Sequence, residues 1–114
     1  MTLIEFPLKN IPNQPPEKYY GNKEYKVFLD FKKYKNIDNI LEKKATQMLF
    51  RIYEGKGKAK YLIGIKDHGE AVGMDYLKTL NSLYFLLKIS LKINANINKL
   101  RFYKGHFGYI SSAH

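Results

Sequence analysis

The sequence predicts an α+β fold, a two-layer α/β sandwich in which two helices cover one face of a mainly antiparallel or mixed sheet. Three observations predict it: apolar residues alternate over 24–31 and 59–66, they recur at helical spacing over 37–52 and 77–91, and five of the eight glycines fall within 46–74. The expected order of elements is β-α-β-β-α-β-β. Its central part, β-α-β-β-α-β, is also the order of a ferredoxin-like fold, one topology that is consistent with it.

One domain is expected over residues 19–114, preceded by an extended arm over residues 1–18. All four prolines lie in the arm, and proline removes a backbone donor and disfavours helix at the preceding residue. From Asn10 to Lys18 we expect a mobile tail. Apolar residues earlier in the arm would dock on the domain or on a neighbour.

The first strand and the first helix follow the arm. Residues 24–31 alternate between apolar and polar, with Phe28 as the exception, which is typical of a half-buried strand. A helix is expected next, with Asn36 or Asp38 as its N-cap and Gly55 as its C-terminal stop. Its apolar stripe comprises Ile37, Ile40, Leu41, Ala45, Met48 and Ile52, whereas Glu42, Lys43 and Arg51 would face water.

Glycines then shape a connection, a strand and a turn. The segment Lys56-Gly57-Lys58 is not a phosphate loop, because that motif lies between a strand and a helix and ends in Lys followed by Ser or Thr. Residues 59–66 are apolar on both faces and predict a central strand. A turn at 67–69 and a return strand at 70–73 would complete a hairpin. The predicted structural turn residues are Gly55, Gly57, Asp67, Gly69 and Gly73.

A second helix is expected from its N-cap, Asp75, to about residue 93. Its apolar stripe comprises Leu77, Leu80, Tyr84, Leu87 and Leu91, and Leu83, Phe85, Leu86 and Ile89 widen the apolar surface. Core packing is the expected role of most of these side chains, and the alternative is a surface for another domain or subunit. Strands over 97–103 and 107–112 complete the order, with Lys99, Arg101 and Tyr103 facing outward.

The charge of the chain indicates a polyanion as a partner. The formal net charge is +10, from eighteen lysines and two arginines against ten acidic residues, and the basic residues are dispersed. A basic surface favours RNA through counterion release, although biased codon usage in the source genome would produce the same composition. The predicted polyanion-binding residues are Arg51, Lys56, Lys58, Lys60, Lys99 and Arg101, which would position phosphates rather than read bases.

Several other classes of function find no support in the sequence. The chain has no cysteine, which excludes disulfides and cysteine-based zinc sites and fits a cytoplasmic protein. The apolar region 77–93 is interrupted by lysine, asparagine and serine, so no membrane contact is expected. Asp67, His68 and Glu70 sit on one short turn without a second cluster, so no metal site is expected. No nucleophile with an adjacent base stands out, and we expect neither a catalytic residue nor a cofactor.

Two segments resemble a known family. GNKEYKVFL and ATQMLFRIYEGKGKAKYLIGIKDHGEAVGM resemble the N-terminal domain of the eukaryotic GTP-binding protein one/two family, translational GTPases related to elongation factor 1-alpha. The matching features are Glu24-Tyr25-Lys26, Thr46-Gln47-Met48 with Arg51, and the glycine pattern from Glu54 to Gly73. The resemblance covers roughly residues 20–112. Lys58 and Lys66 make this chain more basic than the family pattern.

The resemblance implies a non-catalytic N-terminal domain, with the G domain that binds GTP and Mg²⁺ expected just beyond Ala113. The chain would then be an excised or truncated N-terminal domain, whose partners would be its own G domain, RNA or the ribosome. A second hypothesis is a protein–protein interaction or homodimerisation module that uses the helix at 75–93. A third follows from a weaker similarity of Ile63 to Gly73 to the Schlafen-like nucleic-acid-binding domain. A nuclease of that kind would depend on Glu54, Asp67 or Glu70.

Overall fold

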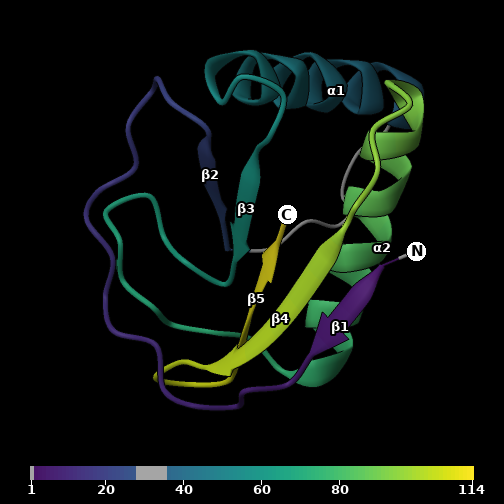
Figure 1. Cartoon of the computed structure of the whole chain (residues 1–114). Helices are drawn as coiled ribbons and strands as arrows, with labels where there is room; N and C mark the ends of the chain where they lie inside the picture. Colours follow the sequence, from purple (N-terminus) through teal and green to yellow (C-terminus); the bar gives the residue numbers. More distant parts are fainter. Residues whose placement is uncertain (1, 28–35) are drawn as a thin grey trace.

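The computed structural model describes residues 2–27 and 36–114. It confirms the predicted α+β fold, as a five-stranded mixed sheet with two helices (Figure 1). Along the chain the elements are β1 (Leu3–Glu5), β2 (Lys23–Lys26), α1 (Ile37–Glu54), β3 (Lys60–Ile63), α2 (Tyr76–Lys92), β4 (Lys99–Lys104) and β5 (Tyr109–Ala113).

The strands lie in the order β1-β4-β5-β3-β2. The two outer pairs, β1 with β4 and β2 with β3, are parallel, whereas β5 pairs antiparallel with both of its neighbours. The strand β3 therefore has a neighbour on each side, as its apolar residues on both faces predicted. The parallel pair of β2 and β3 is joined through α1, the connection that a parallel pair requires.

Two elements of the predicted order are wrong. The observed order is β-β-α-β-α-β-β, because residues 3–5 of the arm pair with β4 as a strand, and residues 70–73 do not form one. After the turn the chain makes only single bridges, Ile65 with Ala71 and Met74 with Tyr109. The ferredoxin-like order needed the strand at 70–73 and is not observed. Residues 28–31 of the predicted first strand lie outside the described residues.

Both helices begin, and α1 ends, where the capping residues predicted. The side chain of Asn36 accepts from the backbone N–H of Asn39, and Gly55 closes α1 through its N–H to the carbonyl of Arg51. The side chain of Asp75 accepts from the N–H of Lys78 at 2.8 Å. Neither helix among the described residues has the length and hydropathy of a membrane span.

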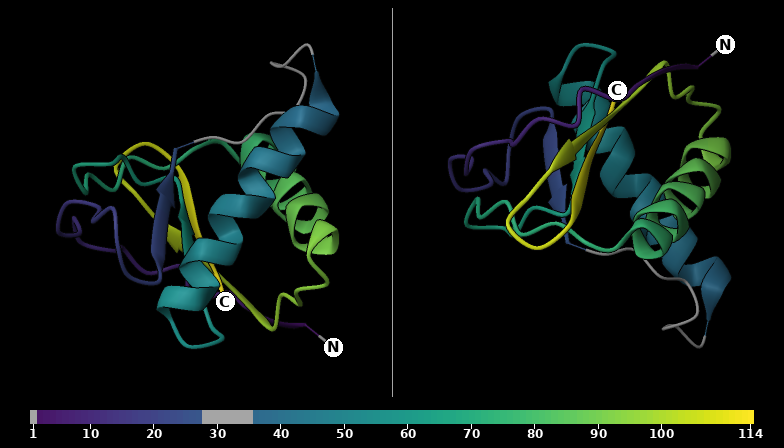
Figure 2. Two further views of the ribbon diagram at one scale, coloured as in Figure 1. Left: turned by 90° about the horizontal axis from the view of Figure 1, so that it is seen from above. Right: turned by 90° about the horizontal axis from the view of Figure 1, so that it is seen from below.

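The helices cover one face of the sheet, and the main core lies between the two layers (Figure 2). Because strand side chains alternate between faces, every second residue of β3, β4 and β5 enters this core. Its buried members are Leu41, Ala45, Met48, Tyr61, Ile63, Met74, Leu83, Phe85, Leu86, Ile89, Phe102 and Ala113.

The opposite face holds a smaller core, which the arm partly covers. Tyr25, Leu62, Ile65, Ala71 and Ile110 are buried there, with Ile11 of the arm packed against them. The expectation of a mobile tail from Asn10 to Lys18 is wrong. Residues 10–18 make hydrogen bonds with the domain: two run to the turn that follows β3, two to Tyr25, and one each to Lys104, Ala71 and Arg51. The prolines keep this segment out of helices and sheet ladders, so its other backbone groups find their hydrogen-bond partners in the domain.

The predicted orientation of α2 is also wrong. The buried residues of the helix are Thr79, Ser82, Leu83, Phe85, Leu86, Ile89 and Ser90, so a mixed polar and apolar face packs on the sheet. The stripe from Leu77 to Leu91, which we expected mostly in the core, is exposed. Because α2 is apolar on more than one side, its hydrophobic pattern could not identify the face that the sheet covers.

Candidate nucleic-acid interface

Four basic side chains form a row across the sheet face that lies away from the helices. Lys23 of β2 is the register partner of Lys60 of β3. His114 follows β5 and lies beside Lys99 of β4, since the N–H of His114 donates to the carbonyl of Lys99 at 2.9 Å. Tyr61 pairs with Ala113, which places Lys60 and His114 side by side as well. We call Lys23, Lys60, His114 and Lys99 the basic row.

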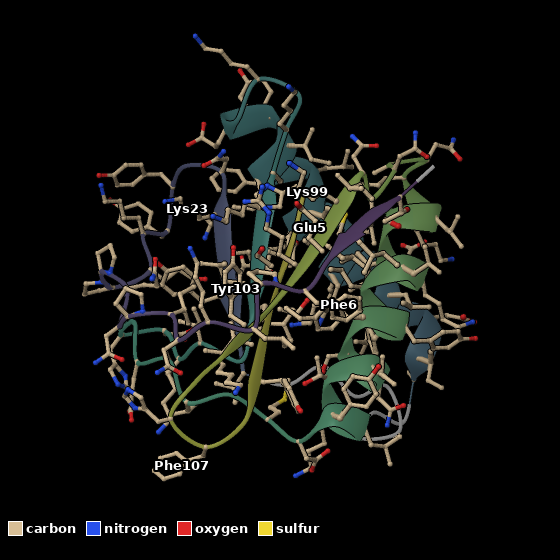
Figure 3. All side chains as sticks on the ribbon, turned by 60° about the horizontal axis from the view of Figure 1, so that its bottom comes forward. Glu5, Phe6, Lys23, Lys99, Tyr103 and Phe107 are labelled. Carbon is tan, nitrogen blue, oxygen red and sulfur yellow. The ribbon has the colours of Figure 1, made fainter. Side chains whose placement is uncertain are left out.

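Strand alternation turns the basic row away from the helices. The neighbours of the row, Tyr61, Ala113 and Leu100, pack in the core under the helices, and Glu24 bonds to α1. Residues next to these in sequence therefore point to the opposite face. In Figure 3 Lys23 and Lys99 lie at one end of the sheet, with Glu5 beside Lys99. Adjacent strands are about 4.8 Å apart, so the row crosses four strands within roughly 15 Å.

Partial burial and neighbouring positive charges lower the pKa values of two members of the row, Lys60 and His114. Burial, followed by the charges of Lys23 and Arg101, lowers the pKa of Lys60 below its usual value. Burial, followed by the charges of Lys60, Arg101 and Lys99, lowers the pKa of His114. The Nε2 atom of His114 is buried and has no hydrogen-bond partner among the described residues. A positive charge on either group is therefore less favourable here than in water.

Acidic residues neutralise little of this surface. Within the described residues Lys23, Lys60 and Lys99 form no ion pair. Arg101 lies on the same face, two residues beyond Lys99, and pairs with Glu5 through Nε at 2.8 Å. The hydrogen bond from Arg101 lowers the pKa of the Glu5 carboxyl, and the same bond raises the pKa of Arg101. This exposed pair leaves the face with a surplus of positive charge.

The predicted polyanion residues fall into three groups. Lys60, Lys99 and Arg101 share the sheet face described above. Lys56 and Lys58 are exposed in the connection that leads from α1 into β3, and Lys58 is two residues from Lys60. Arg51, the sixth residue of the prediction, does not lie on the surface.

Arg51 is a buried structural residue rather than a phosphate contact. Its side chain is 4% exposed and pairs through Nε with the buried Glu24 at 2.8 Å. Its two remaining nitrogens donate to the backbone carbonyls of Lys18, Tyr20 and Gly21. Arg51 therefore joins α1 to the segment before β2 and to β2 itself. The expectation that it faces water is wrong, because a buried carboxylate and three carbonyls match its planar fork of donors.

The predicted turn residues organise both ends of β3. Gly55 closes α1, and Gly57 continues the connection with its N–H donating to the carbonyl of Ile52. The carbonyl groups of Asp67 and Gly69 accept from the arm, at Glu17 and Gln14. The N–H of Gly73 donates to the carbonyl of Gly64 at 2.9 Å.

No grouping of carboxylates or imidazoles in the described part of the chain could hold a metal ion. Glu54 precedes β3 and Asp67 and Glu70 follow it, so the strand separates the three carboxylates that a nuclease would need. Glu54 instead accepts from the N–H of Gly21. Glu70 lies near Lys66, His68 and His106 in an exposed group.

A pocket of about 480 Å³ opens between α1, α2 and the segment that enters β4. Apolar residues of both helices, Met48, Leu49, Ile52 and Leu86, form one side of it. Its polar lining comprises Lys58, Tyr61, Ser90, His114 and three asparagines, and includes no carboxylate.

Sequence reasoning missed Lys23 and His114 as members of the basic row. The alternation in the sequence predicted a strand that starts after Lys23, at Glu24. Only the parallel register of β2 with β3 places Lys23 beside Lys60. His114 joins the row because β5 lies between β3 and β4. The outward position of Lys99 and Arg101 was predictable, since they alternate with the apolar residues Leu100 and Phe102.

The structure thus defines an α+β domain with a basic sheet face and, among its described residues, no grouping that could hold a metal ion. Comparison with known proteins finds GTP-binding protein 2 of Mus musculus and GTP-binding protein 2 of Homo sapiens, each 37% identical to this chain over 92 residues. The match covers 81% of this chain and 15% of each relative, so the chain spans a small part of their length. No family model matches the chain. No solved structure matches it.

Proposed function

We propose that this chain is a non-catalytic domain of a GTP-binding protein of the elongation-factor-like translational GTPase class. The similarity to GTP-binding protein 2 over 81% of the chain supports the class. The resemblance of residues 20–112 supports the rest of the proposal. It suggests an N-terminal position in the parent protein, a link to translation and packing against a G domain. GTP and Mg²⁺ would bind to that G domain and not to the residues described here.

The domain would contribute a binding face for the phosphate backbone of RNA, on the ribosome or free. The observation that carries this proposal is the basic row, four cationic or protonatable groups side by side, with Arg101 close to them. Ammonium groups in a row on a flat face fit a run of phosphates, and they do not read base edges. A bound phosphate would relieve the repulsion that Lys60 experiences from Lys23 and Arg101, and the partial burial of Lys60 would strengthen its attraction to the phosphate.

The first test is a salt titration of RNA binding, measured by fluorescence anisotropy with a labelled single-stranded oligonucleotide. If Lys23, Lys60, Lys99 and Arg101 each neutralise one phosphate, log K should fall with log salt with a slope of about −3. Binding should be equally strong for unrelated base sequences, since the contacts are to phosphate. Affinity that does not change with salt, or no binding at low salt, would remove the proposal.

Acidification should strengthen RNA binding and weaken the free domain. The pKa of His114 is lowered in the folded state, so the unfolded chain binds its proton first as the pH falls through about 6.5. The free energy of unfolding should therefore decrease from there toward the folded pKa. A bound phosphate favours the protonated imidazole, so RNA affinity should rise over the same window.

The variant His114→Gln separates this effect from other titrating groups. Its RNA affinity should lose most of the increase below about pH 6.5, although His68 and His106 remain in the chain. Unfolding by urea at pH 5.5 and 7.5 gives the matching stability comparison. An unchanged pH profile of RNA binding in this variant would show that His114 does not contact the polyanion.

A further inference from the structure

The exposed stripe of α2 has the spacing of a helix–helix seam. Its five residues are Leu77, Leu80, Tyr84, Leu87 and Leu91, separated by three, four, three and four positions. They are between 40% and 68% exposed, although four of the five are leucines. This is the a and d pattern of a heptad repeat, which places one apolar line along the helix. We call these five residues the heptad stripe.

The helical layer carries exposed apolar side chains in addition to those of the heptad stripe. Leu49 and Phe50 of α1 are about half exposed, and Leu49 lines the pocket that opens between the two helices. The heptad stripe alone presents on the order of 500 Å² of apolar surface, near the upper end for the largest patch on a monomeric protein. A standard interface buries about 800 Å² per partner, so the stripe would supply its apolar centre.

We propose that the occupant of the heptad stripe is a second copy of this chain, packed with its α2 antiparallel across a two-fold axis near Tyr84. In this register Leu77 faces the partner's Leu91, and Leu80 faces the partner's Leu87. An identical helix has the same spacing, so each leucine finds a leucine and Tyr84 meets the partner's Tyr84 near the axis. The antiparallel arrangement also opposes the two helix dipoles.

The distribution of charge fits this pairing. Lys78 and Lys92 lie on the flank of α2 away from the stripe, and Lys88 extends over the ring of Tyr84, with Nζ 5.3 Å from its centroid. Lys88 would thus remain at the rim, its aliphatic part packed and its charge in water. The basic row lies on the opposite face of the sheet, so the dimer keeps both basic faces outward.

The oligomeric state tests the proposal directly. Sedimentation equilibrium over a wide range of concentrations should show a monomer–dimer equilibrium. The dimer should become tighter as salt increases, because salt screens the repulsion between two cationic chains. RNA binding has the opposite salt dependence, so failure of one proposal does not imply failure of the other. A strict monomer at the highest concentrations, with or without salt, would overturn the proposal.

Single substitutions on the stripe identify the surface. Leu80→Glu and Leu87→Glu should each raise the dimer Kd at least roughly 30-fold, because the two-fold axis introduces two buried charges per substitution. Both sites are exposed in the monomer, so far-UV circular dichroism should remain unchanged. Lys78→Glu, on the other flank of α2, is the matched control and should leave the dimer intact. A dimer that survives both leucine variants would use another surface and would contradict the proposal.

Cysteine cross-linking tests the register. The chain has no cysteine, so a single introduced thiol reports on one pair of sites. Tyr84→Cys, close to the two-fold axis, should form a disulfide-linked dimer on oxidation. Leu77→Cys should not link to itself in the antiparallel register, but should link to Leu91→Cys when the two variants are mixed. Self-linking of Leu77→Cys would indicate a parallel pair and would contradict this arrangement.

Discussion

Replacing Arg51 with leucine is expected to lower the free energy of unfolding by about 3–5 kcal/mol, since a buried charge loses its main partner. Glu24 is 1% exposed and, among the described residues, would retain Lys26 as its one ion-pair partner, at 3.0 Å. The carbonyls of Lys18, Tyr20 and Gly21 would lose their donors as well, and buried acceptors without a partner are costly. Urea denaturation of the purified domain measures the change, and Tm should fall by roughly 15 °C.

Two further variants separate charge from geometry at this site. Arg51→Lys should recover only part of the stability, because an ammonium group cannot reach four acceptors that match a planar fork. The double variant Glu24→Leu with Arg51→Leu removes both charges and should be more stable than Arg51→Leu alone. If Arg51→Leu costs less than about 1 kcal/mol, the ion pair does not hold α1 to β2.

Replacing Gly69 with alanine is expected to cost about 3 kcal/mol, the second large effect. Gly69 has a φ of 104°, and a Cβ there would lie 1.8 Å from the carbonyl oxygen of Gln14. That oxygen belongs to backbone, so the arm would have to leave the turn. The bond from the N–H of Gln14 to the carbonyl of Gly69, now 2.7 Å, would be lost with it.

Gly57→Ala is the matched control for this substitution. Gly57 also has a φ of 104°, but a Cβ there meets nothing within 4 Å. It should therefore cost only the conformational strain, about 1–2 kcal/mol. Limited proteolysis should cut within residues 10–18 in the Gly69 variant and not in the Gly57 variant. Equal costs and equal protection would show that the arm does not pack against the turn.

The class of fold was predictable because helix and strand periods differ and because capping residues stand at the helix ends. Asn36, Gly55 and Asp75 act where their chemistry predicted. The strand in the arm was not predictable from its three residues, since a short edge strand is defined by its pairing with β4. The same is true of residues 70–73, which form single bridges in place of a ladder.

The candidate site was predictable in part. Alternation along one strand placed Lys99 and Arg101 on the outer face, but neighbours across strands depend on sheet order, which the sequence pattern does not contain. Arg51 has the sequence pattern of an exposed helical cation. Its burial follows from Glu24 on a strand twenty-seven positions earlier, a long-range contact that helical spacing cannot reveal.

The most direct test of the basic row compares two double variants in RNA binding. Lys60→Gln with Lys99→Gln removes two charges from the row, and Lys78→Gln with Lys92→Gln removes two from α2, so each variant has a net charge of +8 instead of +10 (10 − 2 = 8). The row variant should lose affinity at least tenfold and reduce the salt slope by about 1.4, whereas the α2 variant should stay near the parent chain. Equal losses in the two variants would show that net charge alone attracts RNA, and would contradict a defined interface on this face.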